Sequence, residues 1–76
     1  MRVINWYEVS SIILEHMGDK GWDAKDLVAH SGVSKQTVYK LLNGGAIKLE
    51  SLLDICDALN ITPDLLFGYL DRRGKH

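Results

Sequence analysis

Apolar residues recur at the three- and four-residue spacing of amphipathic helices along most of the chain. The first such stretch predicts a helix that begins near Ile4 or Asn5 and runs to about Met17. Its expected core face consists of Trp6, Val9, Ile13 and Met17, widened by Ile12 and Leu14. Two glycines within residues 18–21 weaken any continuation, so we expect the helix to break there.

A capping signal marks the start of a second helix. Asp23 can accept from the amides of the first turn, Asp26 follows three residues later, and apolar Trp22 lies just outside. The box is imperfect because aspartate reaches back less well than glutamate. Residues 31–33 contain the glycine that a sharp turn between two helices needs. The pattern predicts a helix that ends near His30 and leads through a tight turn into a third helix.

The third helix, residues 34–43, has two faces of opposite character. Ser34 is a favoured N-cap, and Gly44 can adopt the left-handed conformation that ends a helix. One side is apolar and consists of Val38, Leu41 and Leu42. The other side carries Gln36, Lys40 and Asn43, flanked by Thr37 and Tyr39, with Lys35 in the first turn. A helix this short is not stable alone, so other helices must hold its apolar side while its polar side faces a partner.

Two more helices follow a short glycine-containing loop. Residues 49–59 are predicted to form a fourth helix with an apolar face of Leu49, Leu52, Leu53, Cys56 and Leu59, and with Ile55 beside it. Thr62 as N-cap, Pro63 at the first helical position and Asp64 in the first turn predict a restart. This fifth helix is expected to reach about Tyr69.

The length of 76 residues predicts one all-α domain of five helices, residues 1–70, and a polar tail, residues 71–76. A core of this size leaves no room for a substrate cleft, so we expect no enzymatic activity. The chain has neither a bilayer-crossing run nor a signal-peptide pattern, which predicts a cytoplasmic protein. The single cysteine, Cys56, fits a reducing compartment and shares no metal-ligand spacing with the histidines. We therefore expect neither a metal nor a cofactor.

Charges are separated along the chain although they sum to only −1. Residues 27–49 contain no acid and three lysines, which are Lys35, Lys40 and Lys48. Residues 50–71 contain five acids and neither Lys nor Arg. This separation predicts positive potential around the third helix and an acidic surface elsewhere. A chance distribution of a few solvated charges is the alternative interpretation.

Three motifs together carry a family resemblance. Leu27–Ser34 looks like a helix end with a glycine-valine-serine turn, Thr37–Gly44 like a recognition helix with an asparagine-glycine end, and Leu49–Leu66 like the two helices that follow. From about Ile12 to Phe67, the chain resembles the lambda-repressor-like, Cro-type helix-turn-helix domains of the XRE family. The resemblance implies a five-helix DNA-binding domain whose second and third helices form the helix-turn-helix.

The chain departs from the family pattern at three positions. Val28 stands where the family usually has a small residue, and Ser31 where it has an apolar one, so the packing between the two helices can differ. Ala24 stands where many members carry a glutamine that holds a phosphate. The resemblance thus implies that this contact is absent and that Lys25 takes its place.

The resemblance also implies that the third helix enters the major groove of DNA with its first turns at the base edges. The residues it assigns to base reading are Lys35, Gln36, Tyr39 and Lys40. A glutamine amide matches the N6/N7 edge of adenine, and a lysine ammonium can donate to O6 and N7 of guanine. Gln36 is therefore the expected principal reader and Lys40 the second. A merely solvated glutamine is the competing interpretation for Gln36.

Phosphate contacts are expected beside the base-reading face. Their candidates are Lys25, Thr37, Lys48 and the backbone amides at the capped starts of the second and fourth helices. Asn43 can also bind a phosphate, although an asparagine before a glycine is a good helix terminus in itself. Such contacts fix the register on DNA and carry no sequence information.

The expected function is that of a sequence-specific transcription regulator, a small repressor that binds double-stranded DNA. One module reads few base pairs, so we expect a homodimer on a palindromic operator. Candidates for the dimer interface are Phe67, Tyr69 and Leu70, although packing on Trp6 explains them equally well. The alternative is a protein-binding module, antitoxin-like or anti-repressor, that uses the acidic face of the last two helices.

Overall fold

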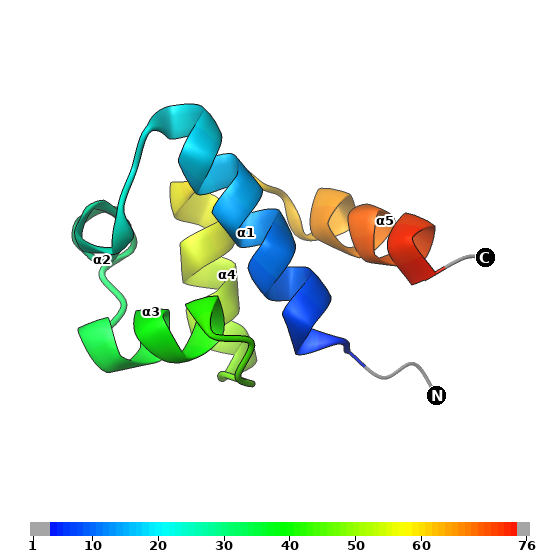
Figure 1. Cartoon of the computed structure of the whole chain (residues 1–76), viewed down its shortest axis with the longest axis horizontal. Helices are drawn as coiled ribbons and strands as arrows, with labels where there is room; N and C mark the ends of the chain where they lie inside the picture. The colour runs from blue at the N-terminus through cyan, green and yellow to red at the C-terminus, as the bar shows by residue number, and fades with distance from the viewer. Residues whose placement is uncertain (1–3, 75–76) are drawn as a thin grey trace.

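Five helices and their connections make up the part of the protein that the structure describes. A computed structural model describes the backbone of residues 4–74 and the side chains of residues 4–68. The helices are α1 (Trp6–Lys20), α2 (Ala24–Ser31), α3 (Lys35–Leu42), α4 (Leu49–Ala58) and α5 (Pro63–Gly74). In Figure 1, α2 and α3 lie at one end of the molecule and α5 at the other, with α1 and α4 between them. The described residues contain no strand, which confirms the all-α prediction.

Side-chain caps set where four of the helices begin. The Asn5 side chain accepts from the amides of Tyr7 and Glu8 at the start of α1. The predicted box at the start of α2 is complete, because Asp23 and Asp26 each accept from the other's backbone N–H at 3.0 Å. Caps at the starts of α3 and α5 are provided by Ser34 and Thr62, whose hydroxyls accept from Thr37 N–H and Leu65 N–H. The caps predicted at Asp23, Ser34 and Thr62 are thus confirmed.

The first helix ends later than its glycines predicted. Gly18 lies inside α1, and the helix ends only at Gly21, which has a left-handed φ of 70°. Gly21 N–H donates to Gly18 O, and Trp22 N–H donates to Met17 O, so two carbonyls of the last turn are satisfied by the turn itself. The prediction of an end at Met17 was wrong because a glycine stops a helix where its left-handed conformation is used, and Gly18 remains helical.

The last helix is also longer than predicted. α5 continues to Gly74 rather than ending near Tyr69. Residues 70–73 include no proline or glycine, and both Arg72 and Arg73 are good helix formers. The first residues of the predicted polar tail, 71–74, therefore belong to the helix.

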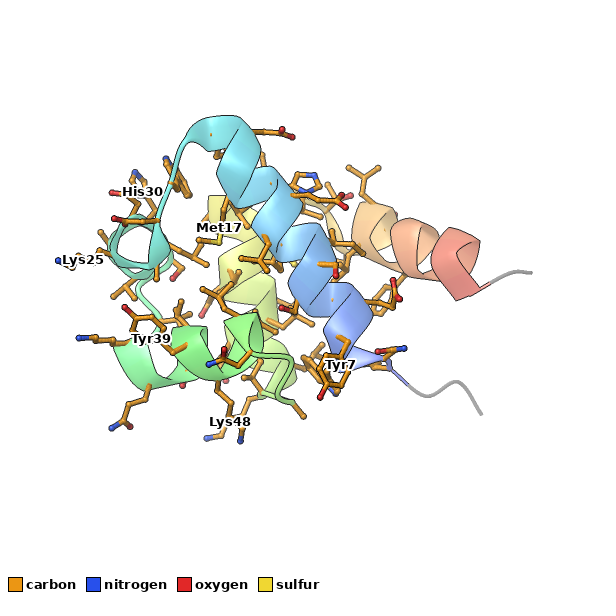
Figure 2. All side chains as sticks on the ribbon, in the orientation of Figure 1. Tyr7, Met17, Lys25, His30, Tyr39 and Lys48 are labelled. Carbon is orange, nitrogen blue, oxygen red and sulfur yellow. The ribbon has the colours of Figure 1, made fainter. Side chains whose placement is uncertain are left out.

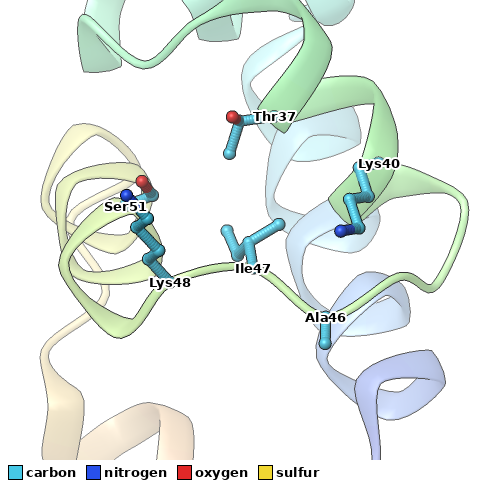
Figure 3. Close-up of a pocket in the computed structure, with 6 residues that line it drawn as sticks. All are labelled: Thr37, Lys40, Ala46, Ile47, Lys48 and Ser51. Carbon is cyan, nitrogen blue, oxygen red and sulfur yellow. The ribbon is translucent and has the colours of Figure 1, made fainter.

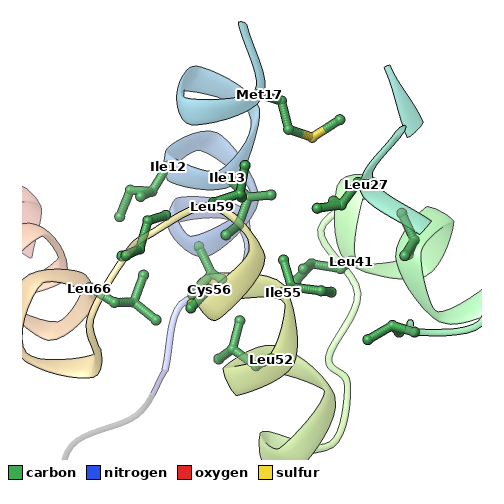
Figure 4. Close-up of a cluster of buried hydrophobic side chains, with 14 residues drawn as sticks. Ile12, Ile13, Met17, Leu27, Leu41, Leu52, Ile55, Cys56, Leu59 and Leu66 are labelled. Carbon is green, nitrogen blue, oxygen red and sulfur yellow. The ribbon is translucent and has the colours of Figure 1, made fainter. Parts of the chain in front are cut away.

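A single apolar core joins all five helices (Figure 4). Its fully buried side chains include Val9, Ile12, Ile13, Leu27, Val38, Leu41, Leu52, Ile55, Cys56 and Leu66. Burial raises the pKa of Cys56 to about 11, so the thiol stays protonated at neutral pH and acts as a small apolar side chain. The contribution of α3 to this core fixes the orientation of its opposite face.

Three leucines that the spacing assigned to the core are exposed. Leu49 is 56 % exposed, Leu14 47 % and Leu53 38 %. Lys48 and Glu50 are exposed as well, so no neighbouring helix covers this side of the first turn of α4. Helical spacing gives the direction of a side chain but not the length over which a partner helix covers it. These three assignments were therefore wrong.

The first half of α1 holds the C-terminal end of α3. Ser10 is buried, and its hydroxyl donates to Leu42 O at 2.8 Å, where the last carbonyls of a helix have no partner within the helix. Tyr7 lies against the loop after α3, and its ring carbons come so close to Gly44 that an added Cβ would be 2.6 Å away. Gly44 also has a left-handed φ of 85°, as its predicted role in ending the helix requires. Both contacts fix α3 relative to α1.

Candidate nucleic-acid interface

The two faces of α3 separate as the sequence predicted. Val38 and Leu41 are fully buried against the other helices. On the opposite side, the four residues assigned to base reading are exposed, namely Lys35, Gln36, Tyr39 and Lys40. Figure 2 shows Tyr39 and Lys48 on the outer surface around α3. A helix whose apolar side packs on the other helices and whose polar side chains face solvent has the geometry needed to enter a groove of nucleic acid.

The lysines around α3 are not neutralised by the protein. Among the described side chains, no carboxylate forms an ion pair with Lys35, Lys40 or Lys48. Four exposed acids, Glu50, Asp54, Asp57 and Asp64, lie on α4 and α5 instead. The surface around α3 is thus positive, which a net charge of −1 conceals.

An open groove lies between α3 and the start of α4 (Figure 3). It has a volume of about 520 Å³ and is lined by Thr37, Lys40, Ala46, Ile47, Lys48 and Ser51. Two ammonium groups and two hydroxyls therefore face one space, which suits an anionic group with several acceptor oxygens. Sequence reasoning missed Ser51, although its place in the first turn of α4, three residues after Lys48, is the signal that could have found it.

The start of α4, at one edge of this groove, lacks the side-chain cap that the start of α3 has. Lys48 is its N-cap residue and makes no side-chain hydrogen bond to the first turn. The expectation of a capped start was wrong here, because lysine has no acceptor atom. The first amides of α4 consequently have no side-chain acceptor, and a positive residue lies at the positive end of the helix dipole.

The first turn of α3 is closed by its own side chains. Ser34 Oγ accepts from Thr37 N–H at 3.3 Å and donates to Thr37 Oγ1 at 2.8 Å. Thr37 is half-buried, and its hydroxyl keeps its proton for a further acceptor at the groove. This arrangement holds the first turn of α3 in one conformation.

A smaller hollow lies on the other side of α3, towards α2. It has a volume of about 130 Å³ and is lined by Lys25, Val28, Lys35 and Tyr39. The Nζ atom of Lys35 lies 5.8 Å from the centre of the Tyr39 ring, within the range of a cation–π contact. The structure thus brings together Lys25, assigned to phosphate, and two residues assigned to base reading.

The outer side of α2 carries an aromatic stack. The rings of Trp22 and His30 are 4.1 Å apart and nearly parallel, and Lys20 Nζ lies 5.2 Å from the centre of the Trp22 ring. His30 Nδ1 lies 2.8 Å from Asp26 O, and the ring is exposed, as expected for a surface histidine. At the start of α2, the backbone N–H of Asp26 donates to the Asp23 carboxylate and lowers the pKa of Asp23, with a smaller contribution from the charge of Lys25.

The remaining site predictions have mixed outcomes. Asn43 is the exposed C-cap of α3, which confirms its role as a helix terminus. Phe67 is half-buried, whereas the side chains of Tyr69 and Leu70 lie outside the described part of the chain.

Among the described residues, no group of His, Cys, Asp and Glu could hold a metal ion. Within the same range, no helix has the length and apolar character to cross a membrane.

The fold and the exposed face of α3 together define a helix-turn-helix protein, in which α2 and α3 form the helix pair. Residues 13–71 match the model of the Cro/C1-type HTH DNA-binding domain. The chain belongs to this family, whose members are DNA-binding transcription regulators and not enzymes. The predicted family and fold class are thereby confirmed.

A solved structure has the same fold from end to end. It is the crystal structure of a point mutant of the restriction-modification controller protein C.Esp1396I, with a TM-score of 0.80 and 20 % sequence identity. The similarity covers 100 % of this chain and 99 % of that one. A search of curated proteins gave no match.

Proposed function

We propose that this protein is a sequence-specific repressor that reads the major groove of double-stranded DNA with α3. The observation that carries this proposal is the exposure of Gln36 and Lys40 on a helix whose Val38 and Leu41 are fully buried on the other side. A rigid helix places such side chains at fixed positions along a groove. The absence of carboxylate partners for the nearby described lysines supports the same surface.

Base reading is assigned chiefly to two residues. Gln36 can donate to N7 and accept from N6 of adenine only in one orientation, which makes its amide selective. Lys40 lies one turn later and can donate to guanine, and it also lines the groove beside α4. It can therefore serve a base edge or the adjacent phosphate.

The groove between α3 and α4 is assigned to the DNA backbone. Lys48, Thr37 and Ser51 offer an ammonium group and two hydroxyls to one space. The first amides of α4, which lack a side-chain cap, add backbone donors at the positive end of a helix dipole. A phosphate in this groove would fix the position of α3 along the DNA.

Two copies of the chain are proposed to bind one operator. A single module covers little DNA, and half-sites about 34–36 Å apart suit a two-fold symmetric dimer. Phe67, Tyr69 and Leu70 of α5 are proposed for the interface, since α5 lies at the end of the molecule opposite α2 and α3 (Figure 1). The acidic outer surface of α4 and α5 would then face away from DNA.

Selection from a random duplex pool tests the proposal directly. The wild-type chain should enrich a palindromic sequence, and Gln36→Ala with Lys40→Ala should lower its affinity for that sequence at unchanged helical circular dichroism. Asp57→Ala is the matched control, because Asp57 is exposed on α4, away from the proposed contacts. Failure to enrich any sequence, or unchanged binding by the double variant, would contradict the proposal.

A second function is favoured by the outer surface of α4. Leu49 and Leu53 are exposed next to Glu50 and Asp54, and this combination of leucines and acids suits a basic, partly apolar protein partner. Such a protein-binding module, antitoxin-like or anti-repressor, can also bind DNA. Loss of partner capture in Leu53→Asp, with DNA binding retained, would establish the second surface as independent.

A further inference from the structure

We propose that Gly45 is a positioning residue for DNA binding, because its missing side chain leaves the space in which the side chain of Lys40 is held. This inference rests on the proposed function, in which Lys40 is the second base reader. Gly45 lies after Gly44 in the loop that joins α3 to α4. Its role is exerted through Lys40 and needs no contact of its own with DNA.

The backbone conformation of Gly45 does not require a glycine. Gly44 has a left-handed φ of 85°, whereas the φ of Gly45 lies outside the left-handed region. An alanine at position 45 would therefore meet none of the strain that a left-handed backbone imposes on a side chain. What separates glycine from other residues at this position is the space around it.

The side chain of Lys40 fills that space. A Cβ added to Gly45 would lie 2.7 Å from Lys40 Cγ, 3.4 Å from Lys40 Cε and 3.0 Å from Lys40 O, so the stem of the lysine runs past the bare backbone of the glycine. Gly45 N–H donates to Lys40 O at 2.8 Å, and Gly44 N–H donates to Leu41 O at 2.9 Å. Because these two bonds fix the loop on the end of α3, a side chain at position 45 would displace the Lys40 side chain first.

Two other helix ends show what otherwise occupies this position. In α1 and α4, as in α3, the amide after the left-handed residue donates to the carbonyl five residues earlier. The residues that donate in this way are Trp22 after α1 and Ile61 after α4. Both pack an apolar side chain against the core, as is common at such helix ends. After α3 the same position carries a glycine, and the side chain that lies there belongs to Lys40.

Packing of the stem prepares Lys40 for binding. Lys40 lines the groove between α3 and α4, and Figure 3 shows its side chain extending from α3 towards Ala46. A long side chain that is restrained before binding loses less conformational entropy when it binds. For one lysine this difference corresponds to about a two- to tenfold change in affinity.

The test is a double-mutant cycle between positions 40 and 45, measured as affinity for the duplex selected from the random pool. Gly45→Ala should lower the affinity of the wild-type chain by about two- to tenfold, at unchanged helical circular dichroism. In a Lys40→Ala chain, where no stem remains to be displaced, the same change should have no effect. Gly18→Ala is the matched control and should leave the affinity unchanged, since Gly18 also lacks a left-handed φ and an added Cβ would meet no atom within 4 Å.

An equal loss from Gly45→Ala in both chains would overturn the inference, because a shifted loop would then explain it without Lys40. An affinity that Gly45→Ala leaves unchanged would overturn it as well. NMR relaxation of the free wild-type chain needs no variant: the Cγ group of Lys40 should be more restricted than that of the exposed Lys48, and equal mobility would contradict the inference. The proposed function is judged separately by Gln36→Ala, whereas a wild-type chain that binds no duplex overturns both.

Discussion

The helices α3 and α4 serve the core in the same way and face the outside with opposite chemistry. Each has two fully buried apolar side chains, Val38 and Leu41 in α3 and Leu52 and Ile55 in α4. The outer face of α3 carries amide and ammonium groups, whereas the outer face of α4 carries carboxylates and two exposed leucines. Burial therefore decides where each helix lies, and the residues that burial leaves unconstrained decide what each helix can bind.

The two helices also begin differently. Ser34 closes the first turn of α3 with its hydroxyl, while Lys48 leaves the first turn of α4 without a side-chain acceptor. Lysine is a poor N-cap for stability, because it brings positive charge to the positive end of the dipole. Lys48 thus lowers the stability of the helix start, and it faces a groove that a second lysine, Lys40, also lines. A residue that opposes stability in such a place is typical of a binding site.

The first prediction, with the largest expected effect, concerns the buried sides of α3 and α4. Leu41→Ala in α3 and Leu52→Ala in α4 should each lower the free energy of unfolding by about 3 kcal/mol, because both side chains are fully buried. Urea denaturation followed by circular dichroism measures this loss. Leu49→Ala is the control and should cost much less, since Leu49 is 56 % exposed. Similar losses for Leu49 and Leu52 would contradict the assigned burial.

The support of α3 by α1 gives the second prediction. Ser10→Ala should lower the free energy of unfolding by about 1 kcal/mol, because Leu42 O loses its hydrogen bond at the end of α3. Ser11→Ala, at the exposed neighbouring position, should change stability by no more than about 0.5 kcal/mol. Thermal or urea denaturation of both variants measures the difference. Equal stabilities would show that the bond from α1 contributes nothing.

The third prediction is that substitutions at the starts of α3 and α4 have opposite effects on stability. Ser34→Ala should destabilise the protein by about 1 kcal/mol, and Lys48→Ser should stabilise it by a similar amount by supplying the missing cap. The same Lys48→Ser change should weaken DNA binding if the groove holds a phosphate. Lys48→Ala separates the two effects, since it removes the charge without adding an acceptor. Denaturation measures the free energy of unfolding, and titration measures the affinity for DNA. The prediction would be wrong if Lys48→Ser lowered both quantities.

The smallest effect concerns pH and compares the caps of α2 and α3. The pKa of Asp23 is lowered in the folded protein, so its ionised cap stabilises the fold above the unfolded-state pKa. That stabilisation is lost as the pH falls through the acidic range, whereas the neutral Ser34 cap does not titrate. Asp23→Asn keeps an acceptor and removes the charge, so its urea midpoint should change less than that of the wild type between neutral pH and about pH 3. An identical change in both proteins would contradict the assignment.

Local signals predicted most of the fold. The caps at Asp23, Ser34 and Thr62 were readable because each depends on residues within one turn of chain. The end of α1 was not, because Gly18 and Gly21 look alike in sequence and differ only in the backbone conformation each adopts. The exposure of Leu49 was also hidden, since it depends on where a distant helix stops covering α4.

The features of the candidate site also fall into those that follow from local sequence and those that depend on how the helices pack. The outward direction of Gln36 and Lys40 follows from the period of a single helix, so the sequence predicted it. The hollow shared by Lys25 and Lys35 depends on how two helices cross, and no spacing along the chain reports that. The bond from Ser10 to Leu42 O is hidden for the same reason, because it joins residues far apart in the chain.

The contact between Tyr7 and Gly44 limits how this chain can evolve. Asparagine is the side chain that most readily tolerates a left-handed backbone, but a Cβ at position 44 would lie 2.6 Å from carbons of the Tyr7 ring. Tyr7 is 74 % exposed, so its ring can turn towards solvent to make room, and its packing on the loop after α3 is then lost. A side chain at position 44 is therefore tolerated more easily by a chain whose residue 7 is small.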